Sequence, residues 1–162
     1  IPDSTGCYYR LYTCHDMHQL LTAYQTMLHE YGSMKEYIRR NATTGIEAIE
    51  ALCRFFSRHG ADKIIPKNTT SACKRVCMFL RWMVRTGSPV DLGLWADIID
   101  RRTLIMPLDT HVVQEAQRMN LLQSRTASMS TARRLTNTML KIFPDDPLKG
   151  DFALFGLGVD NK

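Results

Sequence analysis

Residues 70–85, TSACKRVCMFLRWMVR, carry the strongest helical pattern in the chain. Apolar side chains recur at helical intervals and predict one buried face: Val76, Phe79, Leu80 and Met83. A second face follows spacings of four, three and four: Lys74, Met78, Arg81 and Arg85. The sequence therefore predicts a helix over residues 70–85 that packs through one face and presents a basic stripe on another.

The same pattern continues on both sides of this helix. Residues 16–31, 33–40 and 44–59 read as helices that begin at Asp16, Ser33 and Thr44, which are typical capping residues. Further helical segments are expected at 91–98, from 107–110 onward, at 130–142 and at 152–157. The first dozen residues read as an irregular arm, and no segment reads as a strand. These features predict an all-α fold in one helical domain over residues 1–162.

Composition limits the class of protein. The chain has 162 residues, 44% of them hydrophobic and 23% charged, which is typical of a globular domain. No apolar run approaches the roughly 18 residues of a membrane span, and no signal peptide is evident, so a cytoplasmic protein without membrane contact is expected. The first residue is Ile1, which suggests a missing N-terminal part. A net charge of +5 weakly favours a polyanionic partner such as DNA.

The five cysteines predict neither a metal site nor a disulfide framework. Their positions form no CxxC pair and no zinc-ligand spacing: Cys7, Cys14, Cys53, Cys73 and Cys77. Scattered thiols in odd number fit a reducing compartment. Cys73 and Cys77 lie four residues apart and are expected to be buried small hydrophobes on one helix face.

Three segments together resemble the helix-hairpin-helix superfamily of base-excision DNA glycosylases. They are residues 71–85, residues 105–112 with the sequence IMPLDTHV, and residues 151–158 with the sequence DFALFGLG. The whole chain is still more similar to an uncharacterised bacterial family related to those enzymes, through residues 8–11, 78–85 and 146–147. The resemblance implies a helix-hairpin-helix glycosylase fold, a hydrolase active in DNA repair, no cofactor, and an absent N-terminal portion.

The resemblance assigns catalytic roles to Asp109 and Lys74. Breaking an N-glycosidic bond builds positive charge on the sugar, which a carboxylate stabilises; the carboxylate also deprotonates a nucleophile. A lysine amine that attacks the anomeric carbon forms a Schiff base, which leads to strand cleavage. The simpler alternatives are that Asp109 only caps a helix and that Lys74 is solvated or bound to phosphate. His111 is expected to support the helix start.

Five further residues are candidate DNA contacts. Arg81 and Arg85 would hold backbone phosphates, or would instead pair with acids such as Asp91 or Asp97. The superfamily hairpin has the pattern Leu-Pro-Gly-x-Gly, whereas residues 65–70 read IPKNTT. Without glycine the backbone cannot approach phosphate closely, so side chains would make the contacts: Lys67, Thr69 and Thr70.

Trp82 has two interpretations, and the chain lacks a metal-cluster motif that some members of that superfamily carry. Trp82 would stack on a base or, as an aromatic residue between Phe79 and Met83, belong to the core. No cysteine follows Cys77, so the four-cysteine iron–sulfur motif of some relatives is absent and no iron–sulfur cluster is expected.

Three functions from different classes fit the sequence. The first is a DNA glycosylase, with lyase activity if Lys74 is a nucleophile, acting on a base flipped from the duplex. The second is a non-catalytic nucleic-acid-binding module, and the third is a helical protein-interaction domain. The first requires Lys74 and Asp109 to face one concave, basic cleft; side chains on opposite faces would exclude it.

Overall fold

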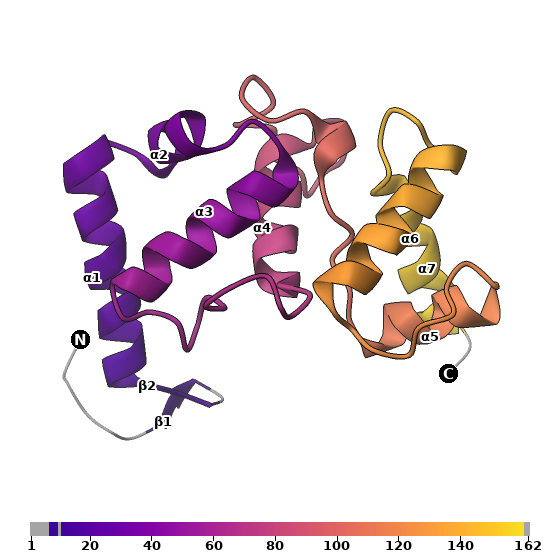
Figure 1. Ribbon diagram of the computed structural model, residues 1–162, viewed down its shortest axis with the longest axis horizontal. Coiled ribbons are helices and arrows are strands. Elements are labelled where there is room, and N and C mark those ends of the chain that lie inside the picture. Colours follow the sequence, from indigo (N-terminus) through magenta and orange to yellow (C-terminus); the bar gives the residue numbers. More distant parts are fainter. Residues whose placement is uncertain (1–6, 10, 161–162) are drawn as a thin grey trace.

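The computed structural model describes residues 7–9 and 11–160, and the fold is all-α as expected (Figure 1). A two-stranded antiparallel ribbon precedes the helices and consists of β1 (Cys7–Tyr9) and β2 (Tyr12–Thr13). The first four α-helices are α1 (Cys14–Tyr31), α2 (Met34–Asn41), α3 (Gly45–Arg58) and α4 (Lys74–Val84). A short 3₁₀ helix, η1 (Arg101–Thr103), is followed by α5 (Thr110–Arg118), α6 (Met129–Ile142) and α7 (Lys149–Asp160).

Local side-chain caps explain where the first helices begin. The Thr13 hydroxyl accepts the Asp16 N–H at 3.1 Å, and Asp16 Oδ2 accepts the Thr13 N–H at 2.7 Å. Asp16 was expected to be the cap, but it occupies the third helical position of a capping box that Thr13 begins. Ser33 and Thr44 cap α2 and α3 as predicted.

The region around α4 departs from the sequence prediction. The helix begins at Lys74 rather than at Thr70, because Cys73 has a left-handed conformation with φ 48° and Ser71 pairs with Ser128 in an isolated β-bridge. The predicted helix over residues 91–98 is a series of turns. The Leu92 N–H donates to the carbonyl of Trp82 at 2.6 Å, which ties this segment to the end of α4 instead.

The remaining differences lie at the two ends. Residues 7–9 and 12–13 form the short ribbon, where an irregular arm was expected. Helix α7 begins at Lys149, three residues before the predicted start. Within the described residues, no helix is both long enough and apolar enough to cross a bilayer.

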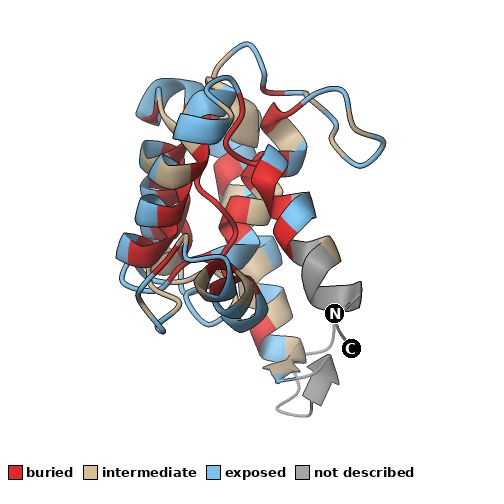
Figure 2. Cartoon of the chain, turned by 90° about the vertical axis from the view of Figure 1, so that its right-hand side faces the viewer, coloured by how far each residue is buried: buried red, intermediate tan, exposed pale blue. Residues whose placement is uncertain are grey.

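Helix α4 lies between two groups of helices. Figure 1 shows α1, α2 and α3 at one end of the molecule and α5, α6 and α7 at the other. Buried apolar side chains from both groups belong to one core cluster, which includes Ile49, Leu80, Leu108 and Leu135. In Figure 2 the buried positions of the helices lie mostly toward the inside of the molecule and the exposed positions mostly at its outside. The start of α4 therefore lies where both groups meet.

Candidate functional site

Lys74 and Asp109 form a direct ion pair, although they are 35 residues apart in the sequence. Lys74 is the first residue of α4 and Asp109 is the N-cap of α5. Lys74 Nζ donates to Asp109 Oδ2 at 2.5 Å, while Asp109 Oδ1 accepts the Val112 N–H at 2.9 Å. The two side chains therefore do not lie on opposite faces, the arrangement that would exclude the glycosylase hypothesis.

The pair is accessible to solvent, so a ligand could reach it. The Lys74 side chain is 48% exposed and the Asp109 side chain is 26% exposed. Partial burial opposes ionisation of Asp109, but the hydrogen bonds from Lys74 and the Val112 N–H outweigh it and lower the pKa of this carboxyl. The residue is therefore both a helix cap and an ionised carboxylate with one oxygen directed at an amine.

Asp151 is a second carboxylate near this pair, and the sequence reading assigned it no role. It lies in the first turn of α7, which packs against α5. Burial raises the pKa of Asp151, an effect that the positive charges of Arg81 and Lys74 oppose and the negative charge of Asp109 reinforces. The sequence signal was present, because residues 151–158 belong to the resembling segments, but it does not reveal which residue Asp151 contacts.

Arg81 and Arg85 form a buried ionic network instead of an exposed phosphate-binding stripe. Their side chains are 3% and 7% exposed. Arg85 Nη1 contacts Asp91 Oδ2 at 2.7 Å, and its Nε and Nη2 reach Asp146 at distances of 2.8 to 3.1 Å. Arg81 contacts Asp91 at 3.5 Å and donates to Asp151.

This network decides between the two alternatives that the sequence left open for the arginines. Side chains so deeply buried have no surface to offer a phosphate. Both arginines pair with buried acids instead, and Asp91 is one of the two partners that the sequence analysis named. Asp97 does not take part, because it pairs with Lys35 and Arg39. The network instead holds α4 against the segments that contain Asp146 and Asp151.

The loop before α4 remains available for contacts. Lys67 and Thr70 are exposed and Thr69 is half-buried. The Thr70 N–H donates to Asn68 Oδ1 at 3.0 Å, which shapes the loop without glycine. Trp82 is 41% exposed and is therefore not a core residue. His111 is exposed directly beside the Asp109 cap.

Three thiols lie buried beside the start of α4: Cys53, Cys73 and Cys77. Hydrogen bonds from Cys53 and, to a smaller extent, from Ser71 outweigh the effect of burial and lower the pKa of Cys73 to about 7. Burial raises the pKa of Cys77 to about 12. Among the described residues, no group of three or more His, Cys, Asp or Glu side chains is arranged to hold a metal ion. The burial expected for Cys73 and Cys77 is confirmed.

Comparison with known proteins places the chain in a family. Residues 2–160 match the family described as "Protein of unknown function (DUF2400)". The chain belongs to this family. No curated protein and no solved structure matches it. The family description gives no activity, so the function of this DUF2400 domain has to be argued from its geometry.

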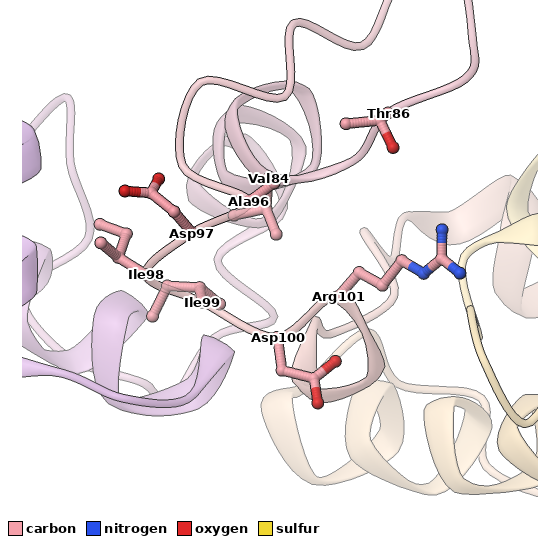
Figure 3. Close-up of a pocket in the computed structure, with 8 residues that line it drawn as sticks. All are labelled: Val84, Thr86, Ala96, Asp97, Ile98, Ile99, Asp100 and Arg101. Carbon is pink, nitrogen blue, oxygen red and sulfur yellow. The ribbon is translucent and has the colours of Figure 1, made fainter.

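Two hollows of the DUF2400 domain lie apart from the ion pair. One, of about 510 Å³, is lined by residues 96–101 with Val84 and Thr86 (Figure 3). Its acids already have partners, since Asp97 pairs with Lys35 and Asp100 pairs with Arg102. The other, of about 550 Å³, is an apolar groove between α1 and α4 that includes Leu21 and Trp95. Neither includes Lys74 or Asp109, so neither is the concave, basic cleft that the glycosylase hypothesis expects at this pair.

Proposed function

We propose that this DUF2400 domain is a DNA glycosylase, with Asp109 and Lys74 as its catalytic residues. The observation that carries the proposal is the 2.5 Å contact between Lys74 Nζ and Asp109 Oδ2 at the starts of two helices. The resemblance of residues 71–85, 105–112 and 151–158 to the helix-hairpin-helix glycosylases supports the same assignment.

The chemistry follows from the two groups in contact. The Lys74 ammonium loses a proton to solvent while Asp109 stays ionised, and the neutral amine attacks the anomeric carbon of the flipped nucleotide. The bond from that carbon to the base breaks, and the base leaves with the bonding pair and takes a proton from solvent. Asp109 stabilises the positive charge that develops on the sugar.

The lysine adduct then determines the second step. The ring oxygen leaves the former anomeric carbon and takes a proton, which gives a Schiff base between that carbon and Lys74. Loss of a proton from the neighbouring carbon then expels the 3′ phosphate and cleaves the strand. If water is the nucleophile instead, Asp109 deprotonates the water and the reaction ends with base release. The two courses differ in whether a covalent enzyme–DNA species forms.

The test is base release from a panel of lesion-bearing duplexes by the full-length protein and by its Asp109→Asn variant. Asparagine is also a good N-cap, so α5 keeps the hydrogen bond from the Val112 N–H. We expect base release to fall by at least about 10²-fold, while DNA affinity changes little. Base release by Asp109→Asn at the wild-type rate would exclude the catalytic role.

A matched control and a trapping experiment complete the design. Like Asp109, Asp100 caps a helix and pairs with a basic side chain, in this case Arg102. Asp100→Asn therefore makes the same chemical change away from the site and should leave base release intact. Borohydride should trap a protein–DNA adduct with the wild type but not with Lys74→Ala.

Two outcomes would favour the other functions. Binding of DNA without any product would favour the non-catalytic module. Absence of DNA binding would favour the protein-interaction domain, for which the apolar groove is the available surface.

A further inference from the structure

Two long segments of the chain contain no acidic residue. Residues 63–90 include six lysines or arginines, and residues 116–144 include five, with neither aspartate nor glutamate in either segment. Positive charge in such segments is opposed only by acids from other parts of the chain. The arginines that the first segment buries are neutralised from outside it, by Asp91, Asp146 and Asp151.

The second segment exposes its charge on one face of α6. Its buried apolar residues are Met129, Ala132, Leu135 and Met139. The opposite face carries four exposed polar residues: Arg133, Arg134, Asn137 and Lys141. Among the described residues, Arg134 and Lys141 take part in no ion pair. Their charges are therefore available to a ligand.

A hollow lies beside this face. Its volume is about 420 Å³, and its polar lining consists of cations, amides and hydroxyls without any carboxylate, including Asn120, Gln123, Arg134, Asn137 and Lys141. Asn120 has a left-handed backbone with φ 55°, which turns the chain from the end of α5 toward α6. The lining offers hydrogen-bond donors and positive charge, the combination that binds phosphate oxygens.

The acid-free segments meet at the candidate active site. Ser71 and Ser128 form an antiparallel β-bridge, which joins the loop before α4 to the N-cap of α6. Figure 1 shows the start of α6 beside the lower end of α4, with the rest of α6 extending away from it. The bridge thus brings the start of α6 close to the loop that leads into Lys74.

We propose that the exposed face of α6 and the adjoining 120–124 turn bind the phosphate backbone of duplex DNA that flanks the reacting nucleotide. This inference rests on the proposed function for the identity of the partner. Arg134 and Lys141 are seven residues apart, or about 10 Å along the helix axis. That separation suits a polyanion with successive phosphates better than a single small anion.

The test compares two double variants that lose the same charge. Arg134→Ala with Lys141→Ala removes the two cations of the hollow, whereas Arg39→Ala with Arg40→Ala removes two exposed cations of α2, which pair with Glu36. Affinity for an undamaged duplex is measured by fluorescence anisotropy at several salt concentrations. Circular dichroism and thermal unfolding of each variant show that it is folded.

The α6 variant should bind about 10- to 30-fold more weakly at 0.15 M salt, with a salt slope smaller by nearly two, as loss of two phosphate contacts requires. The α2 variant should keep the wild-type slope. Equal losses in both variants would reduce the effect to net charge and overturn the proposal. Displacement of DNA by inorganic phosphate, but not by chloride at equal ionic strength, would mark a small-anion site and also overturn it.

The outcome is separable from that of the proposed function. If no duplex yields a product but the α6 variant loses affinity and slope, the backbone surface stands and the glycosylase proposal fails. If Asp109→Asn abolishes base release but the α6 variant binds normally, the glycosylase proposal stands and the backbone surface fails. A wild-type protein that binds no DNA overturns both.

Discussion

Replacing Arg85 by methionine would remove the centre of the buried ionic network while keeping most of the volume of the side chain. Arg85 contacts Asp91 and Asp146, whose side chains are 0% and 4% exposed. The substitution leaves two buried carboxylates without their shared guanidinium. Breaking a buried pair in this way typically costs about 3–5 kcal/mol.

The arrangement of the network places the expected loss at the lower end of that range. Asp91 keeps its contact with Arg81 at 3.5 Å, and Asp146 still accepts the Leu148 N–H at 3.2 Å. We therefore expect Arg85→Met to lower the free energy of unfolding by about 3 kcal/mol. For a domain of this size such a loss corresponds to a fall in Tm of about 10 °C.

Urea denaturation of the wild type, Arg85→Met and the control Arg39→Met measures the effect. Arg39 is 49% exposed and pairs with Glu36 and Asp97 at the surface, so its loss should cost no more than about 1 kcal/mol. If Arg85→Met also cost less than about 1 kcal/mol, Arg85 would not belong to a buried network, and its predicted contact with DNA phosphate would have to be considered again.

Two further predictions concern the start of α3. Hydrogen bonds from the N–H and hydroxyl of Thr43 and from the N–H of Thr44 lower the pKa of Glu47 to about 2. The contribution of Glu47 to stability is therefore fully present above the ordinary glutamate pKa of about 4.3 and is lost as the pH falls toward 2. The urea midpoint of the wild type should fall across this interval more steeply than that of Glu47→Gln, and parallel curves would refute the assignment. Gly45→Ala would place a methyl group 2.4 Å from the Thr103 carbonyl oxygen and should cost about 1–3 kcal/mol in chemical denaturation, whereas Gly156→Ala, with no atom within 4 Å, should cost nothing. Equal stability of the two alanine variants would contradict the close approach.

The sequence predicted those features that depend on neighbouring residues. Ser33 and Thr44 were recognisable as caps because a hydroxyl that satisfies a nearby N–H needs only a local spacing. The apolar face of α4 followed from the 3.6-residue period, and Val76 and Leu80 are buried. The pairing of Lys74 with Asp109 was expected only through resemblance, since spacing alone does not bring residues 35 apart into contact.

Features that depend on distant residues were beyond such reasoning. A stripe of arginines on a helix looks the same whether it faces water or buried acids, and the acids that bind Arg85 and Arg81 lie as far as 61 and 70 residues away. The start of α4 was misplaced for a related reason: the bridge to Ser128 holds residue 71 outside the helix. The turns at 91–98 are fixed by the carbonyl of Trp82, which local periodicity does not report.

The buried acids around α4 tie the middle of the chain to its C-terminal part. Arg81 and Arg85 lie near the middle of the sequence, whereas two of their three partners, Asp146 and Asp151, are among its last residues. The inner face of α4, and with it the position of Lys74 at the start of this helix, therefore depends on side chains 61 to 70 residues further along the chain. A substitution at Asp146 or Asp151 would be felt at the start of α4 although neither residue is near it in the sequence.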